Sequence, residues 1–522
     1  MATGASPGSD QAGKWLTVGV GSLALTVYIL TLAPGLTFEH SGSDGGDLIT
    51  AAWTLGVPHP PGYPLYTLLA WLFTRLPVGT IAYRVNLLSA VCAAGAVALV
   101  CRTAQMLLPR EPHRLALSAS AALTLAFSSL LWSQAVISEV YALLTLLAAL
   151  VLWLVIHWRN GGRDHDLWLA GLTLGLGMGN HLTLAFVAPA IVILLWPQRR
   201  RWFRARTLLP AIGLFLAGLS IYVYLPLAAA HRPPVNWGDP RTWKGFLWVI
   251  SGEQYQAFVF GLKPDEFLPR LGNWALLLGN QFGWWGLLLA LIGIGWWWRR
   301  DRLFVAFAFA WMLPLGIYAF FYDTGDSYVY LLPAVMLLAL FWGEGARYLL
   351  HLARHLRPVW QRTVLVVILL LPLASLALHW KGNDLSRDWQ AHAYAFQALE
   401  SADPGSLIVV RGDRSTFSLW YGLYAEGLRP DVTVVNGPML AFIWYRNHIR
   451  HLYPDLILEE PTGSQQVTWD DLVRDLIVSN YARQPIYAAD PKEPWEEWFE
   501  FTKEEDDPLY RVQPKPRWEQ QP

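Results

Sequence analysis

Long apolar runs recur along most of this 522-residue chain, and they restrict it to a fold that spans a membrane. A run of about 20 apolar residues forms a helix that can cross the hydrocarbon core and satisfy its own backbone polar groups. The runs lie at 14–34, 82–108, 114–136, 139–157, 166–180, 181–197, 206–228, 273–297, 302–322, 327–343 and 361–379. The sequence therefore predicts an all-α polytopic membrane bundle of about eleven transmembrane helices.

The composition agrees with a membrane protein and argues against several other classes. Charged residues make up 15% of the chain, apolar residues make up 54%, and the 29 tryptophans fit the aromatic belts of membrane interfaces. The formal net charge is +0, so we expect no nucleic-acid partner. Cys92 and Cys101 fall in one apolar run and are expected to pack rather than pair. The first run has no convincing cleavage site after it and is expected to remain as a helix.

Arginines mark alternate loops and predict the orientation of the chain. They are Arg102, Arg110, Arg114, Arg159, Arg163, Arg199, Arg200, Arg201, Arg204, Arg206, Arg299, Arg300, Arg302, Arg347, Arg354, Arg357 and Arg362. The positive-inside rule puts such loops in the cytoplasm. We therefore expect a cytoplasmic tail at 1–13, a membrane domain at 14–380 with its first outer loop at 35–66, and an extracytoplasmic domain at 381–522.

The last 140 or so residues are charged and lack a spanning run, which predicts a small separate domain. Residues 406–410 and 431–436 read as buried strands, and helical stretches near 386–400 and 415–427 flank the first of them. Strand–helix–strand order predicts a parallel pair in an α/β domain. The acidic segment 493–507 is expected to be the solvated face of a helix.

The first outer loop holds a dense polar cluster directly after the first apolar run. Its ionisable residues are Glu39, His40, Asp44, Asp47 and His59. Such groups at the mouth of a membrane helix are costly to desolvate unless they are paired or used. We expect a short helix over 47–57 followed by a non-helical His-Pro-Pro segment, and we interpret the loop as an active site. Asp44 and Asp47 are the candidate catalytic residues, while Glu39 and His40 are set aside as interfacial.

Other ionisable residues are expected on the same side of the membrane, next to the spans. They are Arg84, Glu139, His181, Arg232, Asp239, Arg241, Lys244, Asp323 and Asp326. In a compact bundle they would converge on one outward cavity, as in a membrane enzyme with a lipid-linked substrate. Each also has a structural alternative.

Those alternatives are specific. Asp47, Glu139 and Asp239 can cap helices, because an acid at a helix N-terminus offsets the free amides and the dipole. Arg84 can be a snorkelling interfacial arginine, and His59 can be an interfacial histidine held by hydrogen bonds.

Motifs of soluble enzymes are absent from the sequence. It has no Gly-rich nucleotide loop after a strand, no P-loop, no HExxH, no GxSxG and no CxxC pair. A water-soluble nucleotide donor is therefore not expected, and a donor dissolved in the membrane is the natural alternative. The sequence calls for no cofactor, although a divalent cation held by Asp47 is left open.

Several segments resemble the GT-C membrane glycosyltransferase family related to transmembrane protein 260. They are DGGDLITAAWTLGVPHPPGYPLYTLL from Asp44, YRVNLLSA at 83–90, WSQAVISEVYALL at 132–144, GLGMGNHLT at 175–183, YLPLAAAHRPPVNWGDPRTWKGF at 224–246, DSYVYLLPA at 326–334 and the GDRSTFSLWY…EGLRPDVTVVN run at 412–436. The resemblance covers nearly the whole chain in order. It implies a GT-C bundle, an O-mannosyltransferase-like activity, and a polyprenyl-phosphate sugar as donor.

The motif residues of the family fall on Asp44, Asp47, His59, Arg84, Asn86, Glu139, His181, Trp237 and Asp239. The family's second acid is often glutamate, whereas this chain has the shorter Asp47. The resemblance implies that Asp44 accepts the proton of an acceptor hydroxyl, on a protein, glycan or lipid, while the lipid phosphate leaves with inversion. Basic residues, among them Arg84, Arg241 and Lys244, are candidates for binding that phosphate.

A second hypothesis treats the chain as a polytopic transporter or flippase, because intramembrane acids and histidines also suit proton-coupled transport. The polar residues gather on one face rather than at mid-bilayer, and no inverted repeat is visible, which favours the enzyme. A third reading, a scaffold whose outer domain does the work, leaves so many spans unexplained.

Overall fold

The computed structural model describes residues 7–460 and 467–515. These residues form two compact units made of interleaved segments. The helical unit consists of Met1–Leu32, Asn86–Tyr222 and Gln254–Ser386, and the head unit consists of Ala33–Val85, Val223–Glu253 and Arg387–Pro522. The predicted outer loop thus folds with the C-terminal domain in one unit.

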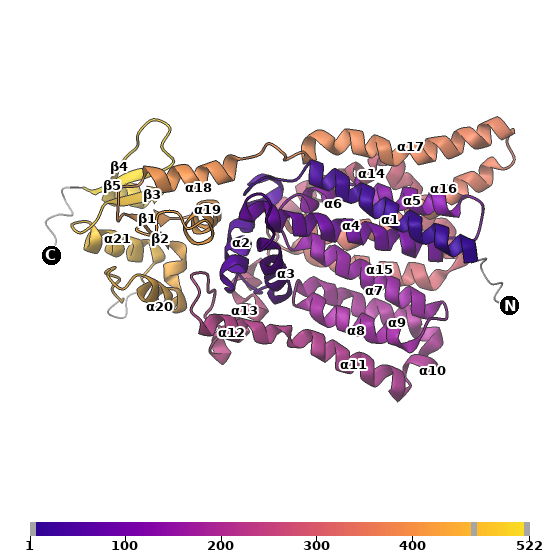
Figure 1. The fold of residues 1–522 in the computed structure, drawn as a ribbon, viewed down its shortest axis with the longest axis horizontal. Helices are drawn as coiled ribbons and strands as arrows, with labels where there is room; N and C mark the ends of the chain where they lie inside the picture. The colour runs from indigo at the N-terminus through magenta and orange to yellow at the C-terminus, as the bar shows by residue number, and fades with distance from the viewer. Residues whose placement is uncertain (1–6, 461–466, 516–522) are drawn as a thin grey trace. The chain divides into compact units, whose positions relative to one another are not determined.

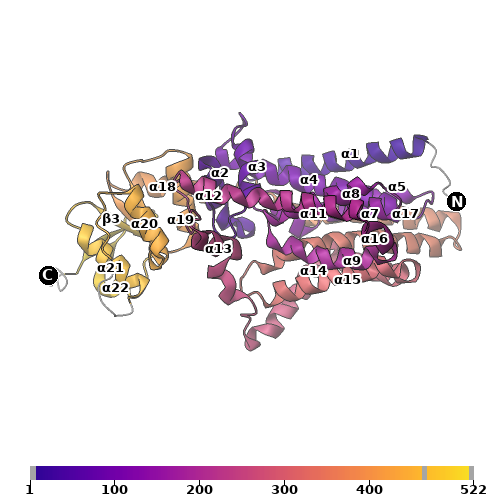
Figure 2. The ribbon, with the colours of Figure 1, turned by 90° about the horizontal axis from the view of Figure 1, so that it is seen from below.

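The helical unit is built from long helices that run side by side in Figures 1 and 2. Its α-helices are α1 (Pro7–Leu30), α4 (Ile81–Leu107), α5 (Arg114–Ala126), α6 (Ser129–Ala135), α7 (Tyr141–Arg159), α8 (Asp164–Met178), α9 (Val187–Leu195), α10 (Arg199–Trp202), α11 (Ala205–Leu219), α14 (Phe267–Arg300), α15 (Arg302–Phe321), α16 (Leu332–Ala353) and α17 (Pro358–Asn383). Short 3-10 turns at Leu182–Phe186 and Ser327–Leu331 precede α9 and α16. Helix α4 begins in the head unit and continues here.

Most of the expected spans are confirmed. In the described residues, nine helices are long and apolar enough to cross a membrane, and the pair α5 and α6, bent by 65°, would make a tenth. The expected span at 166–180 is α8, whose 15 residues fall below the usual length of a span. It packs along α11 and the turn after it. Trp168 Nε1 donates to the Thr207 carbonyl near one end of this contact, and Tyr222 Oη donates to the Met178 carbonyl near the other.

Glycines let the helices of this unit approach closely. A Cβ on Gly345 of α16 would lie 1.9 Å from the Leu289 carbonyl oxygen of α14, and one on Gly293 would lie 1.9 Å from the Phe341 carbonyl oxygen. Membrane helices associate through such small residues because lipid offers no hydrophobic driving force between helices. The pair therefore fixes α14 against α16.

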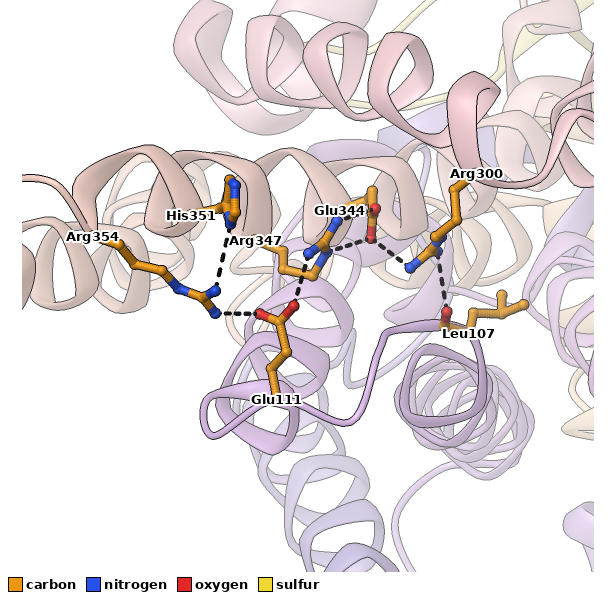
Figure 3. Close-up of polar contacts among 7 residues, drawn as sticks. All are labelled: Leu107, Glu111, Arg300, Glu344, Arg347, His351 and Arg354. Carbon is orange, nitrogen blue, oxygen red and sulfur yellow. Dashed lines mark hydrogen bonds and ion pairs between the residues drawn. The ribbon is translucent and has the colours of Figure 1, made fainter. Parts of the chain in front are cut away.

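The arginine-rich loops meet at one end of the helical unit. Arg159 forms a bidentate ion pair with Asp301, at 2.7 and 2.9 Å. Arg347 and Arg354 both bind Glu111, at 3.0 and 2.9 Å, as Figure 3 shows. These contacts join segments that the sequence separates by more than a hundred residues, so the arginine-rich segments share one end of the helical unit.

The head unit combines short helices with one sheet. Its helices are the 3-10 turn Glu39–Asp44, α2 (Gly45–Thr54), α3 (Pro64–Thr74), α12 (Tyr224–Ala230), α13 (Trp243–Ser251), α18 (Gln390–Ser401), α19 (Asp413–Trp420), α20 (Ile443–Leu452), α21 (Trp469–Asn480) and α22 (Trp495–Trp498). Its strands are β1 (Leu407–Val410), β2 (Thr433–Asn436), β3 (Ile486–Ala489), β4 (Phe499–Thr502) and β5 (Tyr510–Pro514), in the order β2-β1-β3-β5-β4.

The predicted parallel strand pair is confirmed, because β1 pairs in parallel with β2, and also with β3. The prediction for 493–507 was wrong: only Trp495–Trp498 is helical, and Phe499–Thr502 forms β4, antiparallel to β5. The alternation of Phe499 and Phe501 with Glu500 has the period of a strand, and it buries Phe499. The density of acidic residues concealed that period.

Candidate active site

The first outer loop turns sharply before α2. His40 and Ser41 both adopt left-handed backbone conformations, with φ of 57° and 64°, and Asp44 follows at the end of the turn. Helix α2 then packs against α19 at Gly46, where an added Cβ would lie 2.3 Å from the Phe417 carbonyl oxygen. A glycine at this position therefore brings the loop and the C-terminal segment together.

Asp47 lies at the centre of a buried hydrogen-bond network. Its side chain has 0% exposure. Its Oδ2 accepts from the backbone N–H of His59 at 2.9 Å and contacts His59 Nδ1 at 2.7 Å, while its Oδ1 accepts from Trp237 Nε1 at 2.9 Å. Asp47 lies in the first turn of α2, and Asp44, the N-cap residue of that helix, makes no side-chain cap bond. Three donors fix one carboxylate, as a buried charge requires.

His59 connects Asp47 to Asp44. Because Nδ1 donates to the Asp47 carboxylate, the opposite nitrogen Nε2 is the one that faces Asp44, with Oδ2 of that residue at 3.6 Å. His59 is nearly buried, whereas the Asp44 side chain is 38% exposed. In space, the side chains therefore lie in the order Asp47, His59, Asp44: a buried acid, a buried histidine and an accessible acid.

Backbone pairing positions Trp237 beside this group. Val57 N donates to the Val235 carbonyl at 2.9 Å, and Trp237 N donates to the Val57 carbonyl at 3.1 Å. The Trp237 ring and the Tyr63 ring both lie edge-on to the His59 imidazole, at 6.3 and 5.1 Å between centroids. The segment after Gly56 and the WGDP segment thus form one wall of the site.

The other predicted residues of the WGDP segment bind one another. Arg241 donates to both carboxylate oxygens of Asp239, each at 2.6 Å, and this ion pair lowers the pKa of Asp239 although its partial burial acts in the opposite direction. Thr242, not Asp239, caps α13, by accepting from Gly245 N. Lys244 is exposed on α13 and forms no ion pair with the described residues. Lys244 is thus the more accessible of the two predicted cations.

Arg84 has a local structural role. Its guanidinium donates to the backbone carbonyls of Thr74, Val78 and Gly79, at 2.9, 2.8 and 3.1 Å. These carbonyls end α3 and form the turn after it. Its donors are therefore directed at the backbone, and they hold the end of α3 and the turn after it.

Three predicted residues belong to the helical unit. Asn86 Oδ1 accepts from Ser138 Oγ, and the neighbouring Glu139 is buried, with Oε2 3.3 Å from Val140 N. His181 is also buried, and its Nδ1 lies 2.7 Å from Thr183 Oγ1. Glu139 thus accepts from the backbone N–H of Val140, the N-cap residue of α7, as its capping alternative expects.

Asp413 was not among the predicted site residues, although the resembling GDRSTF segment contains it. Asp413 is the first residue of α19, and the charged side chains that affect its pKa are those of His59 and Asp47. Asp413 has exposed surface, but the protein around its carboxyl group desolvates it, and this raises its pKa. The charge of His59 acts to lower this pKa, and the charge of Asp47 acts to raise it. In the sequence, Asp413 belongs to the charged C-terminal domain, which gave no sign that it interacts with Asp47 and His59 of the first outer loop.

Acidic residues and histidines of this kind can also bind metal ions. The described residues contain no group of three or more His, Cys, Asp or Glu side chains that could hold a metal ion. Asp47, which the sequence left open as a cation ligand, has its oxygens directed at His59 and Trp237.

Comparison with known proteins assigns the chain. Two family models match it: the protein O-mannosyl-transferase TMEM260 N-terminal domain over residues 44–202, and TMEM260-associated domain 2 over residues 391–513. Mouse protein O-mannosyl-transferase TMEM260 is 29% identical over an alignment 503 residues long, which covers 86% of this chain and 67% of the relative. Its Dictyostelium discoideum counterpart is 20% identical over 520 residues, and the chain spans 62% of that relative.

Solved structures give the fold. ArnT from Cupriavidus metallidurans bound to undecaprenyl phosphate has a TM-score of 0.59 and 12% identity, covering 95% of this chain and 97% of ArnT. The apo form of ArnT gives a TM-score of 0.62 with 12% identity, covering 96% and 98%. The chain is thus an integral membrane protein with the GT-C fold. Within that class, the chain belongs to the family related to TMEM260.

Proposed function

We propose that this protein transfers a hexose, such as mannose, from a polyprenyl-phosphate donor to an acceptor hydroxyl at the extracytoplasmic side of the membrane. The observation that carries the proposal is the accessible Asp44 carboxylate beside His59, which Asp47 holds from its buried side. The names of the mouse and Dictyostelium relatives support mannose as the sugar. The undecaprenyl phosphate bound to ArnT supports a polyprenyl phosphate as the lipid.

The proposed reaction is a single displacement with inversion. Asp44 accepts the proton of the acceptor hydroxyl, and the hydroxyl oxygen forms a bond to the anomeric carbon of the sugar. The bond from that carbon to the phosphate oxygen breaks, and the lipid phosphate leaves with the bonding electrons. Asp44 suits the role of base because it is the exposed acid of the group, whereas Asp47 is enclosed.

Asp47 and His59 act as positioning residues in this proposal. The Asp47 carboxylate fixes the His59 ring so that Nε2 faces Asp44. Of the predicted phosphate-binding cations in the head unit, Lys244 is the best candidate, because Arg84 and Arg241 donate to protein groups.

The test uses the full-length protein in detergent with a radiolabelled polyprenyl-phosphate mannose and a hydroxyl-bearing acceptor peptide. The wild type is expected to move label from lipid to acceptor, and Asp44→Asn is expected to lower turnover by about 10²–10⁴-fold. Turnover by Asp44→Asn at the rate of the wild type would contradict Asp44 as the base.

A matched control separates loss of the base from loss of the fold. Asp388→Asn changes another acid of the head unit, one that binds Thr37, and is expected to retain turnover. Transfer of intact labelled lipid across proteoliposomes without cleavage would contradict the enzyme and support the transporter hypothesis. A parallel screen of other polyprenyl-phosphate sugars identifies the preferred donor.

A further inference from the structure

Helix α13 of the head unit has two different faces. One side packs inside the unit: Gly245 and Val249 are buried, and a Cβ on Gly245 would lie 2.4 Å from the Gly238 carbonyl oxygen. The opposite side carries large apolar side chains, with Trp243 73% exposed and Leu247 41% exposed. The proposed transfer reaction uses neither of these two side chains.

The helix is held in one orientation, so its exposed face is a fixed surface. Thr242 caps its start by accepting from the backbone N–H of Gly245. On the packed side, the Trp248 ring contacts the rings of Phe442 and Trp444, with centroids 5.5 and 5.6 Å away. The helix therefore cannot roll its apolar face inward without losing its contacts with the C-terminal part of the head unit.

The exposed face has the composition of a helix that lies at a membrane interface. Phe246 and Leu247 follow Trp243 by three and four residues, which places the three side chains on one side of the helix. The Trp243 and Phe246 rings stack, with centroids 5.6 Å apart. The charged residue of α13 is Lys244, and interfacial helices combine such cations with Trp, Phe and Leu.

A neighbouring helix places this face beside the membrane. Helix α12 is the end of a segment, Ala205–Ala230, that is long and apolar enough to cross a membrane. A Cβ on Gly62 would lie 3.0 Å from a side-chain carbon of Leu225 in α12, and 3.0 Å from one of Val249 in α13. Leu227 of α12 is 60% exposed, as a residue that faces lipid can be. Helix α13 therefore lies about one residue's width from the end of a membrane span.

The size and position of the apolar face favour lipid over a protein partner. A helix of nine residues is about 14 Å long. Its exposed side is far smaller than the area of about 800 Å² that each partner buries in a stable protein interface. Residues 231–242 connect α13 to the span before it, and residues 252–263 connect it to the next one, Pro264–Arg300. The chain thus returns to the membrane on both sides of α13.

We propose that α13 is a membrane-surface helix, with Trp243, Phe246 and Leu247 inserted into the interface of the lipid bilayer. Lys244 lies beside them at the level of the lipid phosphates, with its aliphatic stem along the apolar face. The helix supports the head unit on the membrane, because its other face packs within that unit. It also holds Lys244 at the depth of a donor phosphate; that consequence rests on the proposed function, whereas the placement of α13 does not.

The test is power-saturation electron paramagnetic resonance of the full-length protein in liposomes of phosphatidylcholine and phosphatidylglycerol. A nitroxide label on Leu247→Cys is exposed to oxygen, which concentrates in the bilayer, and to a water-soluble nickel complex. Val478→Cys is the matched control, because Val478 is 46% exposed on α21, which lies apart from α13 in Figures 1 and 2. We expect the ratio of oxygen to nickel accessibility to be at least about threefold higher at Leu247→Cys. Cys92 and Cys101 are buried, so the unmodified chain gives the background.

Trp243→Cys repeats the measurement at a second position of the same face and is expected to give the same preference for oxygen. Equal ratios at Leu247→Cys and Val478→Cys would overturn the proposal, since α13 would then face water. A Leu247→Cys label that neither reagent reaches would also overturn it, because a protein surface such as a second copy of the chain would then cover the face. The measurement needs no turnover, so an inactive enzyme with α13 in the bilayer would contradict the proposed function alone.

Discussion

At the scale of single residues, Asp47 explains how the site is held. A carboxylate without exposed surface is stable only if donors surround it, and Asp47 accepts from His59 twice and from Trp237 once. The same bonds direct His59 towards Asp44. The structural and the proposed catalytic requirements on this loop therefore coincide, and a change in one donor should affect both stability and turnover.

Trp237→Phe tests this coupling. The substitution removes the indole N–H that binds Asp47 Oδ1, and we expect it to lower the free energy of unfolding by about 1–3 kcal/mol and to reduce turnover. Trp243→Phe is the matched control, because Trp243 is 73% exposed on α13, and it should change stability by no more than about 0.5 kcal/mol. Denaturant unfolding of the purified variants measures the difference. If both variants lose the same free energy of unfolding, the hydrogen bond from Trp237 to Asp47 does not account for the loss.

Asp413 predicts a dependence of stability on pH. Burial raises its pKa, so its stabilising contribution is complete at low pH and is lost as the pH rises through the raised value. Asp413→Asn should therefore make the melting temperature vary less between about pH 4 and about pH 7. Asp431 should change stability with pH in the opposite direction, because the side chain of Arg429 lowers its pKa. Asp431→Asn should remove stability that is present at neutral pH and lost in acid. If the melting temperature of Asp413→Asn depends on pH as steeply as that of the wild type, the explanation given for Asp413 is wrong.

Residue types and spacing pointed to Asp44, Asp47 and His59 as candidates, because they belong to one short segment with motif-like spacing, and the structure brings their side chains together. Sequence alone could not show which acid is buried, since that depends on Trp237, almost two hundred residues later. It also could not show that Arg84 and Arg241 donate to nearby protein groups. Asp413 was missed because its electrostatic partners lie in a distant part of the chain.

At the scale of elements, the contact between α2 and α19 joins the membrane-proximal loop to the C-terminal α/β fold. Gly46→Ala should disturb it, because the new Cβ would lie 2.3 Å from a backbone oxygen of Phe417 that cannot turn aside. We expect a loss of about 1–3 kcal/mol in unfolding free energy, as for other overpacked sites. Gly412→Ala is the control, since a Cβ there meets nothing within 4 Å and its φ is −103°. Differential scanning fluorimetry compares the two, and an unchanged melting temperature in Gly46→Ala would contradict the close packing.

Hydrophobic length and period predicted the elements unevenly. Long apolar runs identified the spans, since few structures other than a helix satisfy a backbone in lipid. Short elements were harder: the alternation in Phe499–Thr502 was outweighed by flanking acids, and α8 reads as a full span although it has 15 residues. In both cases the deciding influence was a partner, β5 for the strand and α11 for the helix.

At the scale of the whole molecule, the ion pairs of the arginine-rich loops support their common location. Arg159 reaches Asp301, Arg201 reaches Asp164, and Arg347 reaches Glu111, so these ion pairs involve five separate parts of the sequence. Arginine content alone predicted which side of the membrane they occupy. The contacts add that they form one surface of the helical unit, which a count of charges cannot establish.

Single cysteines test the predicted orientation. Pro112→Cys lies in an arginine-rich loop, and Glu504→Cys lies in the C-terminal domain; both positions are exposed. A membrane-impermeant maleimide added to intact cells should label Glu504→Cys, and it should label Pro112→Cys only after the membrane is permeabilised. The native Cys92 and Cys101 are buried, so the unmodified chain serves as the background control. Labelling of Pro112→Cys in intact cells would reverse the orientation, and would move the proposed sugar transfer to the cytoplasmic side.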